Sequence, residues 1–147
     1  MNKQEFQALM KDYPIFLDGA TGSNLQKKGM PTGVCPEQWI LDNREIMISL
    51  QREFTDAGSD IVYAPTFTAN RIKLKEYGLE DKIRQMNKEL VALSKEAVGG
   101  RAYVAGDLTM TGEQLAPMGR LDFEELIDVY KEQIGCLADA GADLLIV

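Results

Sequence analysis

Three residues that can bind a polar ligand stand at the ends of predicted strands: Asp18, Thr66 and Asp107. Each of them follows a short apolar run of the kind that forms a buried parallel strand. Because the carboxyl ends of parallel strands meet at one edge of a sheet or barrel, these side chains would form a polar rim around one mouth. A carboxylate at such a place needs a partner or a ligand, because burying it alone is costly.

Each of the three residues also has a purely structural explanation, and spacing alone leaves both explanations open. Asp18 could accept hydrogen bonds from the turn amides of residues 20–22. Thr66 could cap a turn or helix, and Asp107 could serve as a turn acceptor. The three positions taken together favour a ligand site more strongly than any one of them does alone.

The glycines after Asp18, in the stretch DGATG, do not match a phosphate-binding loop. Gly19 and Gly22 fit two positions of a dinucleotide fingerprint, but Leu25 stands where the third glycine is required. The next predicted strand begins near residue 60, too late for a βαβ unit of roughly 30 residues. The glycines are therefore predicted to bend the chain so that it presents the carboxylate, and a nucleotide-binding oxidoreductase is disfavoured.

Strands alternate with helices along the chain. The predicted strands are Ile15–Asp18, Asp60–Ala64, Arg101–Asp107 and Asp143–Val147. The predicted helices are Asn2–Met10, a helix capped by Asn43 that ends at Ala57, Asn70–Tyr77, Asp81–Val98, and one that starts with a capping-box-like Asp122 and Glu125 and stops at Gly141. Residues 26–42 are predicted to be a long connection.

One sequence unit occurs twice: DAGSDIV at residues 56–62 resembles DAGADLL at residues 139–145. The same helix end, turn and strand start therefore recur two βα units later. Repeated units of this kind fit a (β/α)8 barrel or a doubly wound sheet. The chain ends in four apolar residues of a strand with no following turn, and a complete barrel needs about 250 residues.

We therefore expect an α/β fold that is the N-terminal half of a (β/α)8 TIM barrel: a truncated chain with about four parallel strands and covering helices. Residues 1–147 would form a single partial domain. The outer strands would then present open edges that can pair with another chain. A complete four-stranded α/β domain is the alternative.

Composition narrows the classes of function. The 147 residues carry a net charge of −7, which argues against nucleic acid and against an anionic membrane surface as partners. No apolar run approaches the roughly 20 residues of a membrane span, and the N-terminus is too polar for a signal peptide. Two distant cysteines suit a reducing cytoplasm, and the absence of histidine excludes histidine-based triads on this chain.

Five segments, spread over nearly the whole chain, resemble the homocysteine S-methyltransferase family, above all the N-terminal homocysteine-binding domain of cobalamin-dependent methionine synthases. They are LDGATGSNLQ, PEQWILDN, AGSDIVYAPTFTANRIKL, YGLE and AGDLTMTGE. The resemblance implies a (β/α)8 barrel about twice this length. It also implies transfer of a methyl group to the sulfur of homocysteine, which gives methionine.

The resemblance implies that zinc binds the homocysteine sulfur and favours the thiolate, the reactive nucleophile. In the family the zinc ligands are three cysteines on later strands, so no metal ligand and no catalytic residue is expected among these 147 residues. Cys35 falls in the predicted connection and Cys136 in the last predicted helix, and two ligands cannot close a tetrahedral site. No cofactor is expected on this chain itself.

The resemblance also assigns substrate-binding residues. Asp18 and the backbone of Gly19 and Ala20 would border the ammonium and carboxylate of homocysteine, and Thr66 would help to hold the same end. Asp107 would shape the mouth, and the family places a glutamate just after the position of Val147. The sequence departs from the family pattern at residues 64–65, where Ala-Pro replaces Thr-Asn or a similar pair.

The expected function is therefore that of a methyltransferase whose amino-acid-binding half is this chain. The expected partners are homocysteine and the remainder of the polypeptide, with methylcobalamin and methyltetrahydrofolate as donors supplied by other modules. The chain alone is expected to be inactive. Two alternatives stay open: a stand-alone enzyme with an S-methylmethionine or betaine-type donor, and a non-catalytic half-barrel that assembles through its open edges.

Overall fold

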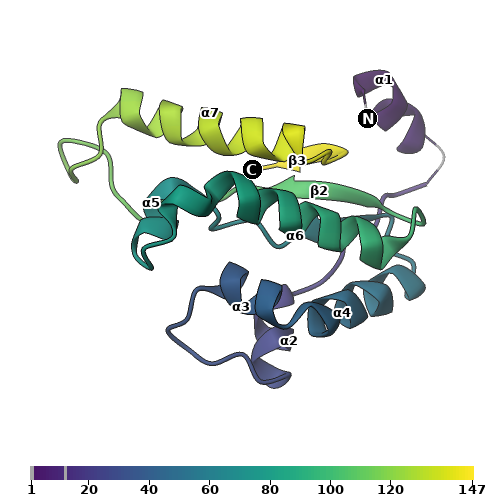
Figure 1. Cartoon of the computed structure of the whole chain (residues 1–147). Helices are drawn as coiled ribbons and strands as arrows, with labels where there is room; N and C mark the ends of the chain where they lie inside the picture. The colour runs from purple at the N-terminus through teal and green to yellow at the C-terminus, as the bar shows by residue number, and fades with distance from the viewer. Residues whose placement is uncertain (1, 12) are drawn as a thin grey trace.

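A parallel sheet forms the centre of the computed structural model, which describes residues 2–11 and 13–147 (Figure 1). Its strands β1 (Ile61–Ala64), β2 (Tyr103–Asp107) and β3 (Leu144–Ile146) lie in the order β1-β2-β3. Leu17 adds one isolated parallel bridge to Ile61 on the outer side of β1. The carboxyl ends of all these segments point to the same edge, as parallel pairing requires.

Helices connect the strands of this sheet. They are α1 (Lys3–Leu9), α2 (Thr21–Lys27), α3 (Pro36–Asp42), α4 (Arg44–Asp56), α5 (Arg71–Lys75), the 3₁₀ helix η1 (Glu80–Lys82), α6 (Ile83–Val98) and α7 (Phe123–Asp139). The crossover from β1 to β2 runs through α6, and that from β2 to β3 runs through α7 (Figure 1). Among the described residues, no helix is both long and apolar enough to cross a membrane.

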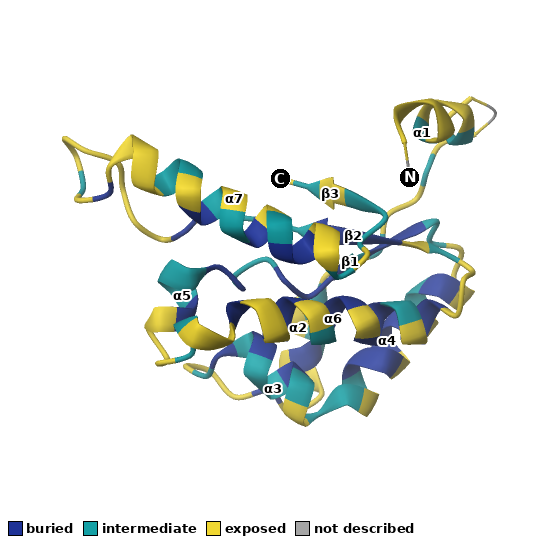
Figure 2. Ribbon diagram, turned by 45° about the horizontal axis from the view of Figure 1, so that its top comes forward, coloured by how far each residue is buried: buried dark blue, intermediate teal, exposed yellow. Residues whose placement is uncertain are grey.

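The two faces of the sheet differ in how they are covered. Side chains of β1 and β2 such as Val62 and Val104 are buried against apolar residues of α6 and α7, among them Val91 and Leu137. The buried sides of α6 and α7 face the sheet in Figure 2. The opposite face lines an apolar groove of about 530 Å³ between the sheet and α1. The sheet is therefore packed on one face and partly open on the other.

The prediction of about four strands holds only in part. The segment predicted as the strand Ile15–Asp18 makes a single bridge, and its residues Phe16 and Leu17 are 59% and 46% exposed. The strand predicted to reach Val147 ends at Ile146, and Val147 is 88% exposed. Both segments lie at the outside of the sheet, where no described strand pairs with them on the far side, so their apolar residues are not covered on both faces.

The prediction that residues 26–42 are a connection is wrong, because this region contains the end of α2 and all of α3. Pro36 is compatible with this helix because it stands at the first position of α3, where its missing N–H costs nothing. The capping predictions are also wrong in detail. Asp122 makes no side-chain cap at α7, and Asn43 donates to the carbonyl of Trp39 (2.8 Å) instead of capping α4.

The predicted repeat is confirmed as a structural unit. Asp60 and Asp143 each stand just before a strand, after a glycine with positive φ. Asp60 accepts a hydrogen bond from the backbone N–H of Phe16 (2.9 Å), and Asp143 accepts one from that of Val104 (2.8 Å). Both aspartates thus tie the start of their own strand to the preceding segment of the sheet.

Candidate functional site

A cavity of about 220 Å³ lies at the carboxyl ends of β1 and β2. Its lining comes from the turn after Leu17, the end of β1 and the end of β2: Gly19, Thr21, Gly22, Tyr63, Ala64, Pro65, Phe67 and Asp107. Of the site residues predicted from the sequence, Gly19 and Asp107 line this cavity, whereas Asp18, Ala20 and Thr66 are next in sequence to lining residues. The cavity is the candidate site for a small polar ligand.

Asp18 is held at this site by the backbone of β1. Its N–H donates to the carbonyl of Ile61 (3.0 Å), and its Oδ2 accepts from the N–H of Tyr63 (3.2 Å). Its Oδ1 is buried and has no hydrogen-bond partner among the described residues. Burial raises the pKa of Asp18 to about 7, the hydrogen bond from Tyr63 opposes the rise, and the charge of Asp107 adds to it.

Asp107 is the second carboxylate of the site and lines the cavity directly. Burial raises its pKa to about 6. The negative charge of Asp107 also contributes to the raised pKa of Asp18. A cationic group in the cavity would relieve the unfavourable burial of negative charge, so the pair is suited to bind an ammonium group.

Gly19 and Ala20 form the turn that leads from Asp18 into α2. A Cβ atom at Gly19 would lie 2.9 Å from Cε1 of Phe54, so only glycine fits here without movement of that ring. Ala20 is the N-cap residue of α2 and makes no side-chain cap. The turn therefore brings backbone close to the cavity and adds no side chain from either residue to fill it.

Thr66 lies at the predicted strand end, but its hydroxyl is used inside the protein. Thr66 is fully buried, and its Oγ1 donates to the carbonyl of Asp107 (2.9 Å) and accepts from the N–H of Asp107 (3.1 Å). The side chain thus joins the end of β1 to the end of β2. The assignment of Thr66 as a substrate-binding residue stays a prediction.

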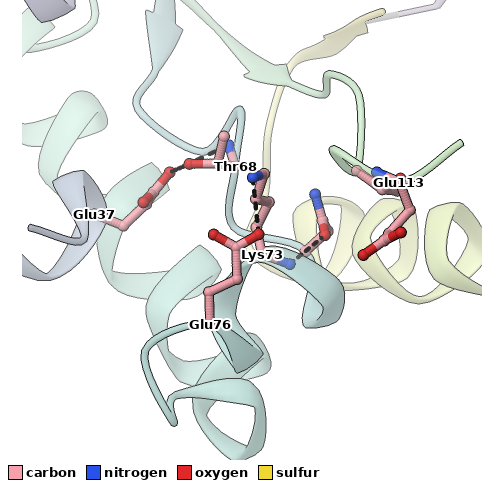
Figure 3. A network of polar contacts seen from close by, with 7 residues as sticks. Glu37, Thr68, Lys73, Glu76 and Glu113 are labelled. Atoms are coloured by element: carbon pink, nitrogen blue, oxygen red, sulfur yellow. Dashed lines mark hydrogen bonds and ion pairs between the residues drawn. The ribbon is translucent and has the colours of Figure 1, made fainter. Parts of the chain in front are cut away.

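A buried carboxylate next to this site was not foreseen from the sequence. Glu37, at the start of α3, is 1% exposed and accepts hydrogen bonds from the hydroxyl and the N–H of Thr68 (Figure 3) and from the thiol of Cys35. Glu37 fixes the loop after β1, which carries the cavity residues Pro65 and Phe67. The signal for it was the proline-acid pair at residues 36–37, which is typical of a helix start.

Other residues that line the cavity were also not predicted from the sequence. Thr21, Tyr63 and Phe67 line it, although no motif singled them out. A larger groove of about 620 Å³ lies between α5 and the segment before α7. Its lining mixes cations such as Arg120 with acids such as Glu113, so its charge selects no ligand class.

The described residues do not fit the zinc site that the family resemblance implies. Cys35 and Cys136 are both free and buried, at the start of α3 and within α7. Burial raises the pKa of both thiols, that of Cys35 to about 11, which disfavours the thiolate that a zinc ion requires. Among residues 2–11 and 13–147, no group of three or more Cys, Asp or Glu side chains is arranged to hold a metal ion.

Comparison with known proteins assigns the family. The chain belongs to the homocysteine S-methyltransferase family, whose sequence model matches residues 15–147. It is 27% identical to methionine synthase of Mycobacterium tuberculosis (strain ATCC 25618 / H37Rv) and 26% identical to that of Mycobacterium leprae (strain TN). Each match covers 88% of this chain and 12% of the methionine synthase, so the chain spans about an eighth of the length of these relatives.

Solved structures show the same fold. The metallated form of the homocysteine methyltransferase MmuM from Escherichia coli superposes with a TM-score of 0.79 at 22% sequence identity, over 95% of this chain and 55% of that one. The oxidized form gives a TM-score of 0.78 at 21% identity, over 98% and 56%. The fold of this chain is therefore similar to about half of that homocysteine methyltransferase.

Proposed function

We propose that this chain binds the amino-acid end of homocysteine for the transfer of a methyl group to its sulfur. The observation that supports the proposal most directly is the pair of partly buried carboxylates, Asp18 and Asp107, beside a 220 Å³ cavity in a chain of this family. A cavity of that volume accepts a small amino acid.

In this proposal the ammonium group of homocysteine lies against Asp18 and Asp107. Oδ1 of Asp18 is buried without a partner among the described residues, and it can accept one of these hydrogen bonds once the side chain turns toward the cavity. The carboxylate of homocysteine faces the backbone at Gly19 and Ala20, where no side chain blocks its approach. The positive charge of the ligand keeps both aspartates ionised.

We propose that the sulfur is activated outside these residues. In the reaction the thiol releases its proton to solvent, the sulfur forms a bond to the methyl carbon, and the bond between that carbon and the donor breaks with its electron pair left on the donor. Zinc would favour the thiolate in the complete enzyme, but the residues of this chain do not fit it, so no step is assigned to zinc here. Methylcobalamin, recharged from methyltetrahydrofolate by further modules, is our proposed donor.

Titration with L-homocysteine tests the proposal. In the protein as its cell makes it, Asp18→Asn and Asp107→Asn should each weaken the binding of homocysteine by at least about 10-fold, because a charge-assisted contact with the ammonium group is lost. Asp81→Asn removes the same charge from an exposed position and is the matched control. Equal affinity in all three variants would contradict the proposal.

We further propose that residues 1–147 alone do not turn over, that they form one partial domain, and that the protein is cytoplasmic, in line with two free cysteines. Zinc titration of the isolated chain, read out by alkylation of homocysteine thiol, would detect stoichiometric metal and turnover if the first of these were wrong.

An S-methylmethionine or betaine-type donor is the alternative within the family. The open apolar groove beside α1 keeps assembly through the sheet as a second candidate function, which light scattering would reveal.

A further inference from the structure

Two fully buried glutamines stand behind the site and have no part in the proposed contacts with homocysteine. Gln51 comes from α4 and Gln133 from α7, and both are 0% exposed. Each donates its side-chain N–H to a backbone carbonyl at the end of β1 or just after it. The Oε1 atoms of both glutamines are buried without a partner among the described residues. Burying an amide oxygen without a hydrogen-bond partner lowers the stability of the fold, which points to a role of these glutamines beyond packing.

Hydrogen bonds through the backbone of Tyr63 connect Gln51 to Asp18. Nε2 of Gln51 donates to the carbonyl of Tyr63 (2.9 Å), and the N–H of the same residue donates to Oδ2 of Asp18 (3.2 Å). The backbone of one residue of β1 thus links a helix side chain to a site carboxylate. A displacement of Tyr63 would move the donor away from Asp18.

Hydrogen bonds through Thr66 connect Gln133 to Asp107 in a similar way. Nε2 of Gln133 donates to the carbonyl of Thr66 (2.7 Å), and the hydroxyl of Thr66 holds both the carbonyl and the N–H of Asp107 (2.9 and 3.1 Å). Here one residue just beyond β1 again links a helix side chain to a site carboxylate. Gln133 and Thr66 are internal to the protein, since both are 0% exposed, and the third member of the route, Asp107, lines the cavity.

We propose that Gln51 and Gln133 are positioning residues that act separately on the two carboxylates of the site, Gln51 through Tyr63 on Asp18 and Gln133 through Thr66 on Asp107. Thr66 is then also a positioning residue rather than a direct contact of the substrate. The proposal rests on the proposed function for its consequence in binding, but the two hydrogen-bonded routes are independent of which ligand the cavity takes.

The test compares Gln51→Met with Gln133→Met, which remove the amide and keep an unbranched side chain of similar length. Carbon NMR of the aspartate carboxyl groups measures the titration of Asp18 and Asp107 in each variant. We expect Gln133→Met to lower the midpoint of Asp107 by at least half a pH unit, because water reaches a loosened strand end, and to change that of Asp18 less. Gln51→Met should raise the midpoint of Asp18, because the N–H of Tyr63 that opposes its raised pKa moves away, and should change that of Asp107 less. A general loss of stability would shift the titration midpoints of Asp18 and Asp107 equally, and this result would overturn the proposal. Unchanged midpoints in both variants would also overturn it.

A double-mutant cycle carries the test to binding. Gln133→Met and Asp107→Asn should each weaken the binding of homocysteine by about 10-fold, and the double variant should bind no more than about 2-fold more weakly than Asp107→Asn alone. If the double variant bound homocysteine about 100-fold more weakly than the unaltered protein, the two residues would act independently, and this result would overturn the proposal. If the unaltered protein bound no homocysteine, the proposed function would fail, while the carboxyl titrations would still decide the positioning roles.

Should Gln133→Met not fold, substitutions at Thr66 address the same route. Thr66→Val keeps the shape of the side chain and removes the two hydrogen bonds to Asp107, whereas Thr66→Ser keeps them. We expect the midpoint of Asp107 to fall in the valine variant and to return in the serine variant. Equal midpoints in the two variants would contradict the role of the hydroxyl.

Discussion

Replacement of Asp18 by asparagine should make the protein more stable at neutral and alkaline pH and a poorer binder of homocysteine. Asparagine keeps an oxygen that can accept from the N–H of Tyr63, and it removes a charge that the folded protein buries at a cost. The prediction separates the function of the carboxylate from its effect on stability, because the two change in opposite directions.

The sign and size of the stability change follow from the pKa of Asp18, which folding raises from 3.8 to about 7. Between these two values the folded state binds more protons than the unfolded state, so the stabilisation present below pH 4 is lost as the pH rises through 7. The full difference corresponds to roughly 4 kcal/mol. Asp18 is only partly buried, and solvent screening reduces the expected gain to about 1–2 kcal/mol.

Urea denaturation from pH 4 to pH 8.5 measures this effect. The free energies of unfolding of Asp18→Asn and the unaltered protein should agree near pH 4 and diverge as the pH rises, with the variant more stable above pH 7. Asp81→Asn, an exposed site, should not reproduce the divergence. A constant difference across the range, or a variant less stable at pH 8, would refute the reasoning.

Three further predictions concern the surroundings of the site. Gly19→Ala should lower the free energy of unfolding by about 1–2 kcal/mol, since its Cβ would meet the Phe54 ring at 2.9 Å, whereas Gly22→Ala has open space in a helix and should be neutral or stabilising; chemical denaturation of both variants checks this. Glu37→Leu should cost about 2–3 kcal/mol in the same assay, because it leaves buried donors unpaired, and Glu37→Gln, which keeps an acceptor, should cost less. The thiol of Cys35, with a pKa of about 11, should react with iodoacetamide at pH 8 about 100-fold more slowly than free cysteine, as mass spectrometry would show; an equal rate would mean that the thiol is accessible.

Long amphipathic helices and the repeated turn could be predicted from the sequence because local pattern determines them. The predicted helix ending at Ala57 is α4, and the predicted helix Asp81–Val98 contains α6 and the last two residues of η1. The two strand-start aspartates, Asp60 and Asp143, could be paired by sequence alone because each sits after the same glycine turn. These features need only neighbours within one βα unit.

The location of the site could be predicted from the sequence, but the hydrogen bonds that hold its residues could not. The strand-end rule brought Asp18 and Asp107 to one mouth, since parallel strands share an edge. It could not foresee that the hydroxyl of Thr66 holds the backbone of Asp107, or that Gln51 and Gln133 reach β1 from two helices. Those contacts join residues far apart in the chain, and a lone glutamine on a helix carries no signal of its partner.

The account depends most on recognition of an ammonium group by the two carboxylates at the mouth of the sheet. The measurement that tests it most directly is calorimetric titration of the protein, as its cell makes it, with L-homocysteine and with 4-mercaptobutanoate, which lacks the amino group. We predict that 4-mercaptobutanoate binds at least about 10-fold more weakly, because no cation then faces Asp18 and Asp107. Equal affinity for the two thiols would contradict the account.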